Sequence, residues 1–489
     1  MKVIKTNTDA KRALKIGVDT VANLVKTTLG PSGQNVIIER FRQAPLITND
    51  GYTIVNAIEI EDEVENLGAE YIKEASRLTN KNAGDGTTTS IVLTQALIDR
   101  VFEDLEGNLL GNNGMAKRAE INKVKDEIIK ELDAMAKPIT KKSEIENVAS
   151  VSAESKELGK LIADIVEKVG PNGSVSVDDS PINETIAEVT EGIEIQRGIV
   201  HPGQMTDFGK RRAIYKQAPI VIFDGTINDV QQMVAVIQKA AASGFKALVM
   251  VATDWNYDVI EGVVMSKMQG GFPVLCLETP GFGHKGKDET EDLAVAVGAK
   301  ILNNLTLLSV SDFGKAEQVI ASEDSTLFVG GGGKNDVKNK RVELLKEQLN
   351  THSDTEWIER RIAQLTEGMG VVKVGASSIG EREYLKLKIE DAINATRAAI
   401  QEGVVPGGGK ALKSLAPKFK GTIFENVLTA PYDQIQFNAG GSLDIPPSIV
   451  DPVKVVKEAI RNSSSVAGTL ITTNGAIAVK KEDDKKDKK

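Results

Sequence analysis

The spacing of apolar residues predicts that the first part of the chain is mainly helical. Apolar residues recur at intervals of three and four over residues 7–29 and again over 65–81, and this period is typical of helices with one buried face. More helix is expected up to about residue 134. Short apolar runs at 36–38 and 46–48 predict two strands between the first two helices.

A different pattern begins near residue 190. Continuous apolar runs predict strands at 220–223, 247–251 and 274–277, and helix-spaced segments at about 228–243 and 257–269 lie between them. A strand–helix–strand repeat places neighbouring strands parallel with right-handed crossovers. This part of the chain is therefore predicted to be an α/β unit.

Both helices of this α/β unit carry more apolar surface than one buried face requires. The apolar positions fall into two adjacent stripes on each helix: Val230, Val234, Ile237 and Ala241 beside Met233, Val236 and Ala240, and Val259 and Val263 beside Ile260, Val264 and Met268. One stripe must be core. The second is either core as well or an exposed groove for an apolar polypeptide or partner.

Composition narrows the class of protein. The 489 residues are enough for about two to four domains. A net charge of −9 and an aromatic content of 4% argue against nucleic-acid binding. No segment has the length and apolarity of a membrane span, and the N-terminus lacks the apolar core of a secretion signal. With one cysteine, Cys276, and three scattered histidines, a soluble cytoplasmic protein without a disulfide is expected.

The stretch Ala83-Gly84-Asp85-Gly86-Thr87-Thr88-Thr89 stands directly before a predicted helix. Free N–H groups and hydroxyls at a helix start favour an anion, and glycines allow a phosphate to approach the backbone closely. Asp85 would repel a bare phosphate, so its presence suggests a bridging Mg²⁺. The alternative is an ordinary loop followed by a Thr-capped helix.

Two more carboxylates and a glycine cluster have motif-like surroundings. Asp50 lies in a predicted turn, Asp391 in a predicted helix, and Gly407-Gly408-Gly409 follows that helix. Taken singly, the two carboxylates can be a turn former and part of a solvated helix face. The chain has no Walker A motif, which excludes a P-loop nucleotide site. Any nucleotide site must therefore be assembled from separate segments.

Five ordered motifs resemble those of the bacterial-type (group I, GroEL-type) chaperonins: Thr28-Leu29-Gly30-Pro31-Ser32-Gly33, Ile47-Thr48-Asn49-Asp50-Gly51, Gly84-Asp85-Gly86-Thr87-Thr88-Thr89, Glu390-Asp391-Ala392 with Ala395-Thr396-Arg397, and Gly407-Gly408-Gly409. The resemblance covers nearly the whole chain. It implies a multidomain α and α/β chaperonin fold. The equatorial ATP-binding domain would comprise 1–134 and 403–489, the intermediate hinge domain 135–189 and 370–402, and the apical polypeptide-binding domain 190–369.

The resemblance also assigns roles within an ATP site. The residues expected to hold the nucleotide are Thr28, Leu29, Gly30, Pro31, Gly51, Asp85, Gly86, Thr87, Thr88, Thr89, Gly408, Gly409 and Asp451. Asp85 would hold Mg²⁺, and K⁺ is a further candidate ion. Asp391 would act as general base on the attacking water with Asp50 assisting.

The implied partners are non-native polypeptides and further copies of the chain. Apical positions that match the family's polypeptide-binding residues are Ile199, Val234, Ile237, Val259, Val263 and Val264. A homo-oligomeric ring is expected, with seven subunits in a single or double ring, and a GroES-type co-chaperonin is a candidate lid. No nucleic acid or membrane partner is expected.

The chain departs from the family at several positions. Asn49 stands where the family usually has lysine, and Gly203 and Gln204 replace aromatic residues. The segment between Gly409 and Asp451 is some tens of residues shorter than usual, and it normally contributes adenine and ring-to-ring contacts. Asn438-Ala439-Gly440 is a candidate replacement for the adenine-contacting segment. The shortening favours a single ring or weakly stacked rings.

These observations favour an ATP-driven folding chaperonin. The main alternative is a holdase or scaffold on the same fold with a weakened nucleotide site. A small-molecule kinase would explain the phosphate-binding residues but would leave the surplus apolar surface of the α/β unit without a role.

Overall fold

The computed structural model describes residues 2–40, 45–106, 114–170, 173–180, 182–208, 210–281, 283–349, 354–366 and 368–479. Two sequence features lie outside these residues: most of the Gly/Asn-rich segment 107–114, which predicts a break between helices, and the tail 480–489, whose Lys/Glu/Asp composition predicts disorder. The chain folds into two compact units: unit 1 comprises 1–164, 177–186 and 373–489, and unit 2 comprises 165–176 and 187–372. The predicted apical segment falls in unit 2. The division of the remainder into equatorial and intermediate domains stays a prediction.

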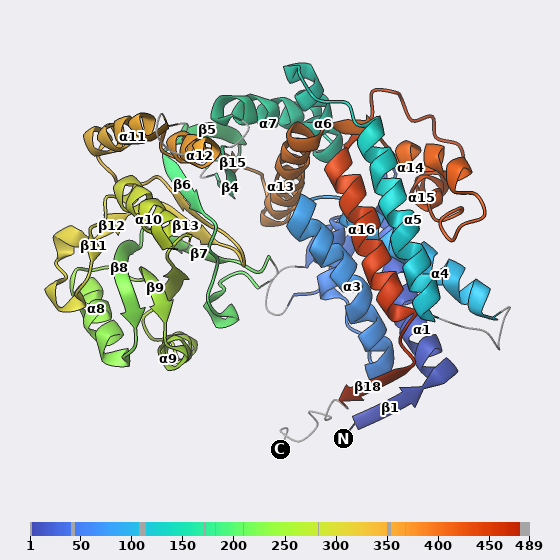
Figure 1. Ribbon diagram of the computed structural model, residues 1–489, viewed down its shortest axis with the longest axis horizontal. Coiled ribbons are helices and arrows are strands. Elements are labelled where there is room, and N and C mark those ends of the chain that lie inside the picture. The colour runs from blue at the N-terminus through green and yellow to red at the C-terminus, as the bar shows by residue number, and fades with distance from the viewer. Residues whose placement is uncertain are drawn as a thin grey trace. The chain divides into compact units, whose positions relative to one another are not determined.

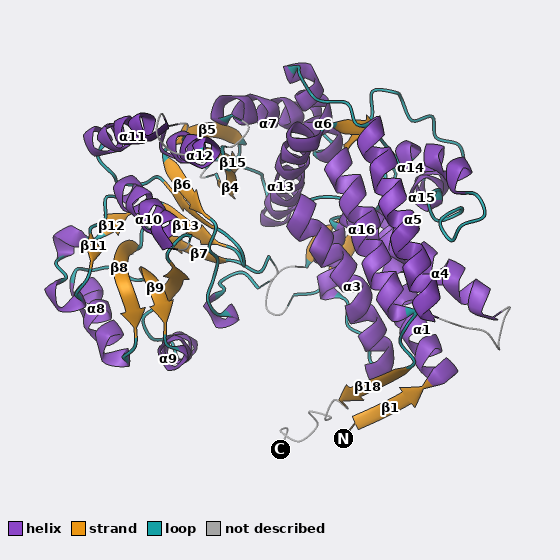
Figure 2. Ribbon diagram, in the orientation of Figure 1, coloured by secondary structure: helices purple, strands orange, loops and turns teal. Residues whose placement is uncertain are grey.

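Unit 1 is built on long helices that lie side by side (Figures 1 and 2). Its helices are α1 (Asn7–Val25), α2 (Gly51–Ala57), α3 (Glu63–Ala83), α4 (Thr87–Glu106), α5 (Gly114–Met135), α6 (Lys142–Ser152), α7 (Lys156–Val169, which runs on into unit 2), α13 (Ile379–Glu402), α14 (Lys410–Leu415), α15 (Ala430–Asn438) and α16 (Val453–Leu470), with 3-10 turns η1 (Lys26–Thr28) and η5 (Ala416–Phe419). The core joins α1, α3, α4, α5 and α16. The helices predicted from apolar spacing in this unit are confirmed.

Two glycines allow α1 and α3 to touch along their backbones. A Cβ atom at Gly17 would lie 1.8 Å from the carbonyl oxygen of Glu65, and one at Gly68 would lie 2.0 Å from the carbonyl oxygen of Leu14. Neither position has room for a side chain, so this pair fixes the distance between the two helices.

The strands of unit 1 form short antiparallel pairs. They are β1 (Lys2–Thr6) with β18 (Gly475–Val479), β2 (Val36–Ile38) with β3 (Leu46–Thr48), and β16 (Val404–Pro406) with β17 (Val450–Pro452). The β2–β3 pair confirms the two strands predicted near the start of the chain. A three-stranded sheet in the order β4 (Val175–Asp179), β15 (Met369–Val374), β5 (Ile186–Thr190) is formed by segments at which the chain passes from one unit to the other.

Unit 2 contains the predicted α/β unit. Its main sheet has the order β10 (Val274–Glu278), β9 (Leu248–Trp255), β8 (Pro219–Ile227), β11 (Ile301–Leu302), all parallel, with β12 (Gly314–Lys315) antiparallel to β8. Alternate side chains of β8 enter different cores. Val221 and Phe223 pack with α8 (Val230–Ala242) and α9 (Tyr257–Met268), whereas Ile220 and Ile222 pack with α10 (Gly283–Val297).

The sequence did not predict a second sheet in unit 2. It is antiparallel, in the order β6 (Gly192–Ile195), β14 (Thr326–Val329), β13 (Gln318–Ala321), β7 (Ala213–Lys216). The remaining elements of unit 2 are α11 (Asn335–Leu349), α12 (Thr355–Thr366), η2 (Pro202–Gln204), η3 (Leu305–Leu307) and η4 (Val310–Asp312).

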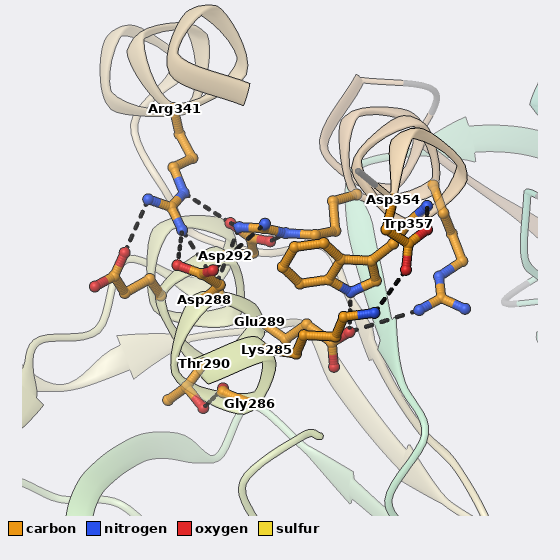
Figure 3. Close-up of polar contacts among 12 residues, drawn as sticks. Lys285, Gly286, Asp288, Glu289, Thr290, Asp292, Arg341, Asp354 and Trp357 are labelled. Atoms are coloured by element: carbon orange, nitrogen blue, oxygen red, sulfur yellow. Dashed lines mark hydrogen bonds and ion pairs between the residues drawn. The ribbon is translucent and has the colours of Figure 1, made fainter. Parts of the chain in front are cut away.

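A buried ion-pair network joins α10, α11 and α12 (Figure 3). Asp292 of α10 accepts from Arg361 Nε at 2.5 Å and from Arg341 Nε at 2.7 Å, and Arg361 is 1% exposed. The Arg361 guanidinium also lies 4.3 Å from the ring centre of Trp357, whose indole N–H donates to Glu289 at 2.8 Å. Removing one partner of such a buried pair would leave an uncompensated charge. The network therefore holds α10, α11 and α12 against one another.

On α9 the three valines that the family resemblance assigns to polypeptide binding are buried, whereas Met268, which belongs to one of the two predicted stripes, is exposed. Val259, Val263 and Val264 are 1%, 7% and 4% exposed and belong to the core between α9 and the sheet. Gly203 packs directly over this helix, because a Cβ there would lie 2.4 Å from Val264 Cγ1. These three residues therefore cannot contact a polypeptide in this conformation.

The close packing of Gly203 on α9 explains why this position is glycine, where the family tends to have an aromatic residue. An aromatic side chain at Gly203 would collide with Val264. On α8 the prediction holds in part: Met233, Val236 and Ala240 are buried, while Val234 and Ile237 are half-buried. Ile199 is also half-buried and bridges to Leu277. The large apolar side chains of α8 and α9 that are exposed are Val230, Tyr257, Met265 and Met268.

Candidate active site

Three carboxylates from distant segments of unit 1 converge. Asp50 precedes α2, Asp85 precedes α4, and Asp391 lies within α13. Removal from solvent, followed by the negative charges of Asp50 and Asp85, raises the pKa of Asp391 well above its usual range. Burial, with a contribution from Asp50, also raises the pKa of Asp85. The structure thus brings together the three acids that the sequence singled out.

Asp50 is fixed by the start of α2. Its two carboxylate oxygens accept from the backbone N–H groups of Tyr52, at 3.2 Å, and Thr53, at 2.9 Å. Its own N–H donates to the Thr48 hydroxyl at 3.0 Å. This N-cap arrangement is the local reason why an aspartate stands here, and it holds the carboxylate in one orientation.

Asp85 lies between two glycines in the left-handed conformation. Gly84 has φ +70° and Gly86 has φ +80°, and a Cβ on Gly86 would lie 2.4 Å from Val455. The Asp85 carboxylate accepts from the Gly86 N–H at 2.5 Å and from the Ser152 hydroxyl at 3.2 Å. The glycines therefore make the tight turn that presents Asp85 beside the first turn of α4.

The first turn of α4 lies against the start of α2. Thr87 is buried and Thr88 and Thr89 are half-buried. A Cβ on Gly51 would lie 2.3 Å from the Thr88 hydroxyl, so glycine is required for this approach. The N-terminus of a twenty-residue helix carries partial positive charge and favours an anion.

A lysine that the sequence analysis missed brings positive charge to the carboxylates. Lys388 lies one turn before Asp391 on α13, and its Nζ is 2.7 Å from Glu154 Oε1. Burial alone would lower the pKa of Lys388, but Glu154 and other acids raise it overall. In turn, the positive charge of Lys388 offsets part of the rise in the pKa of Asp85 and Asp391. The three-residue spacing to Asp391 is the sequence signal that could have identified it.

Lys388 also bears on the departure at Asn49. The Asn49 amide donates to the same Glu154 oxygen at 3.3 Å. A cation from α13 is therefore present near the carboxylates, although the lysine usual at position 49 is absent.

Asp451 connects the glycine cluster to the carboxylates. Its side chain accepts from the N–H groups of Gly408, at 3.0 Å, and Gly409. Burial, followed by the charge of Asp85, raises the pKa of Asp451 to about 7. Gly408 and Gly409 have φ of +64° and +77°, which explains the need for glycine at both positions.

The turn at Thr28–Pro31 is braced by Asn438. The Asn438 amide donates to the carbonyl oxygens of Lys26 and Leu29, both at 2.8 Å, and its own oxygen accepts from Gln434 at 2.8 Å. Its amide hydrogens are therefore both used within the protein. Asn438 does not fit the suggested adenine-contacting role, because it supports the turn instead.

The donor set suits a Mg²⁺ ion that shares its ligands with a phosphate. Among the described residues, no group of three or more His, Cys, Asp or Glu side chains could hold a metal ion alone. Mg²⁺ commonly uses one or two carboxylates together with phosphate oxygens. Asp85 lies beside the N-terminus of α4, and its pKa is raised by burial and by a neighbouring acid. It can therefore serve as the carboxylate ligand of a Mg²⁺ ion that also binds phosphate oxygens.

The chain belongs to the TCP-1/cpn60 chaperonin family, whose model matches residues 21–421. The fold is similar to that of the chaperonin gp146 from bacteriophage EL 2 (Pseudomonas aeruginosa), crystallised in the presence of ATP-BeFx. One crystal form matches with a TM-score of 0.66 and the match covers 98% of this chain and 100% of the phage chain. A second crystal form matches with a TM-score of 0.61, covering 98% of this chain and 99% of the phage chain. The sequence identity is 21% in both cases. The match shows the multidomain chaperonin fold.

Within the part of the chain that the structure describes, no helix is long and apolar enough to cross a bilayer.

The raised pKa of Asp451 predicts a pH-dependent effect of Asp451→Asn. Between the unfolded pKa, near 4, and the folded pKa, about 7, the folded state binds the extra proton, so its stability falls as pH rises through this window. Asparagine keeps an acceptor for the glycine N–H groups and removes the charge. Without nucleotide, the variant should be more stable than wild type by about 1–2 kcal/mol at pH 8 and nearly equal at pH 4, because solvent screens part of the penalty at this half-buried group.

Urea unfolding at pH 8 and pH 4 measures this difference, with exposed Glu127→Gln on α5 as the control. A variant that is equally or less stable at pH 8 would contradict the raised pKa.

Asn438→Asp keeps the size of the side chain and removes both donors to the Thr28–Pro31 turn. We expect the stability of unit 1 to fall by about 1–3 kcal/mol, because two carbonyl oxygens lose their partners and gain a nearby negative charge. Denaturant unfolding measures the loss. The neighbouring Phe437, 78% exposed, provides the control variant Phe437→Ala, which should unfold like wild type.

Proposed function

We propose that this chaperonin hydrolyses ATP, assembles into a homo-oligomeric ring and uses ATP to capture and release non-native polypeptides. The observation that carries the proposal is the convergence of Asp50, Asp85 and Asp391 beside the N-terminus of α4. Acids whose pKa values are raised by burial and by one another are typical of functional sites.

The individual residues have distinct chemical roles in this proposal. Asp85 binds Mg²⁺, and the phosphates lie against the first turn of α4 (Gly86, Thr87, Thr88 and Thr89), Gly51 and the Thr28–Pro31 turn. Gly408, Gly409 and Asp451 contact the ribose and adenine side. Bound ATP with Mg²⁺ supplies the phosphoryl group that is transferred to water.

Asp391 is the general base in this proposal. A carboxylate with a raised pKa holds a proton from water more readily near neutral pH. Asp50, fixed by two backbone N–H groups, assists by orienting the same water. Lys388 is a positioning residue that offsets part of the repulsion among the three acids.

Two exposed apolar ribbons support assembly into a ring. On β2–β3, Ile37 and Ile47 are directly paired and are 69% and 49% exposed; on β1–β18, Ile4 and Ile477 are directly paired and are 65% and 62% exposed. Two-stranded ribbons are marginal alone and present unpaired edges. We propose that one ribbon of each subunit docks on the other ribbon of its neighbour. Seven subunits and a GroES-type partner stay predictions of the family resemblance.

Polypeptide capture is proposed for the exposed apolar residues of α8 and α9, Val230, Tyr257, Met265 and Met268, together with half-buried Val234, Ile237 and Ile199. Methionine side chains adapt to partners of different shape, which suits binding of many sequences.

Steady-state ATP hydrolysis by an Asp391→Ala variant tests the site. We expect ATP binding to be retained and turnover to fall about 100-fold, because a general base contributes at least this factor. Exposed Glu127→Ala should hydrolyse ATP like wild type. If wild type neither binds nor hydrolyses ATP, the site is not functional and a holdase or scaffold on the same fold becomes the better description.

An Ile37→Lys variant tests the ribbon contact. The side chain is exposed within the subunit, so unfolding of the subunit should not change, but a buried lysine would disfavour docking. We expect light scattering after size-exclusion chromatography to show loss of the ring. Leu344→Lys on α11, where the leucine is 52% exposed, is the matched control. Intact rings in the Ile37→Lys protein would contradict the proposed contact.

A further inference from the structure

Acidic side chains surround the exposed apolar face of α9, and their charges are not compensated. Tyr257, Met265 and Met268 are 61%, 52% and 66% exposed and share one face of the helix, together with Glu261. Tyr257 and Met268 are eleven residues apart, so this face is about 16 Å long. We call it the α9 face.

Five exposed carboxylates lie on the α9 face or at the ends of the strands that lead into α8 and α9: Asp224, Asp229, Asp254, Asp258 and Glu261. None of them forms an ion pair with another described residue. Asp229 caps α8 through the Gln231 N–H at 2.9 Å, and the Thr253 hydroxyl donates to Asp224 at 3.4 Å. Four of the five therefore gather where both helices begin, and Glu261 follows one turn into α9.

The two helices themselves supply little positive charge to balance these acids. Residues 224–242 and 253–268 contain no arginine and two lysines. Lys239 donates to the carbonyl oxygen of Leu308 at 2.6 Å, and the other is Lys267. Its Nζ donates to the carbonyl oxygens of Gly203, Gln204 and Met205, at 3.3, 2.8 and 2.8 Å. Lys267 thus holds the 203–205 loop beside α9 and is not available to pair with the acids.

Val230, at the start of α8, lies close to Gly262 of α9. It is 43% exposed, and its Cγ2 lies 3.9 Å from the place that a Cβ on Gly262 would occupy. Asp229 and Asp258 are the sequence neighbours of Val230 and Tyr257 at the starts of α8 and α9. The α9 face therefore has an acidic end at Asp258 and Glu261 and an apolar end at Met265 and Met268.

We propose that the α9 face selects basic–apolar polypeptide segments, whose apolar side chains pack on Met265 and Met268 and whose lysines or arginines approach Asp258, Glu261 and their neighbours. This inference rests on the proposed polypeptide capture and adds the charge of the segments captured. Complementary charge steers such segments to the face and disfavours acidic ones.

Binding of two fluorescently labelled peptides to the full-length, nucleotide-free protein tests the charge preference. The peptides have identical apolar positions and differ only in carrying four lysines or four glutamates. Fluorescence anisotropy should show binding of the lysine peptide that is tighter by at least about five-fold, and this preference should shrink as salt is raised. Asp258→Asn/Glu261→Gln should reduce the preference by about three-fold.

Two further variants complete the test. The control Asp336→Asn/Glu343→Gln makes the same change of charge on α11, at two exposed acids, and should bind both peptides like wild type. Met265→Ser/Met268→Ser should weaken both peptides alike, because it removes the apolar contact without altering the charge.

The outcomes separate this inference from the proposed function. Equal binding of both peptides overturns the charge preference and leaves polypeptide capture intact. If neither peptide binds while ATP is hydrolysed, capture on this face is overturned and the nucleotide site stands. Loss of ring assembly in the methionine variant, with peptide binding unchanged, would show that the α9 face contacts another copy of the chain and would also overturn the inference.

Discussion

The gathering of three carboxylates, Asp50, Asp85 and Asp391, in one part of unit 1 is the constraint that the candidate site must meet. Burial is the main cause that raises the pKa of Asp85 and Asp391, and the negative charge of the neighbouring acids raises both further. The fold tolerates the arrangement because each acid stands on a firmly held element. Lys388, anchored by Glu154, supplies a nearby opposite charge. A divalent cation bound here would offset this surplus of negative charge.

The scaffold holds these groups through helix starts and glycine turns. Asp50 is an N-cap, Asp85 precedes the first turn of α4, and Asp451 accepts from two glycine N–H groups. Asn438 braces the Thr28–Pro31 turn from the shortened part of the chain. The short segment therefore still supports the site, although it does so by holding another loop in place.

Much of the fold follows from residue spacing, and the exceptions have physical causes. Long amphipathic helices such as α1 and α3, and the strands β8 to β10, were predictable because their periodicity extends over many residues. The pairing of β1 with β18 and the sheet of β6, β14, β13 and β7 were not, because their partners are far apart in sequence. The error on α9 has a different origin. Apolar spacing identifies Val259, Val263 and Val264 as core candidates, but it does not reveal how closely Gly203 covers the helix.

In the candidate site too, local features could be predicted from the sequence, whereas contacts between distant residues could not. The motifs identified the three acids and the glycines, since each motif is a short local pattern. The link between Lys388 and Glu154 joins positions 234 residues apart, and no local pattern reports such a pair. Asn438 was noticed for its resemblance to a base-contacting segment, yet its hydrogen bonds show that it has a structural task.

The way unit 2 is inserted into unit 1 has a consequence for synthesis. The chain contributes 165–176 to unit 2, returns to unit 1 for 177–186, completes unit 2 with 187–372, and only then supplies residues 373–489 of unit 1. A nascent chain on the ribosome can therefore finish unit 2 while α13 and α16 have not yet been made. Asp391, Lys388 and Asp451 all belong to this last portion. The order of translation thus keeps the carboxylate cluster incomplete until the end of synthesis, after the α9 face has formed.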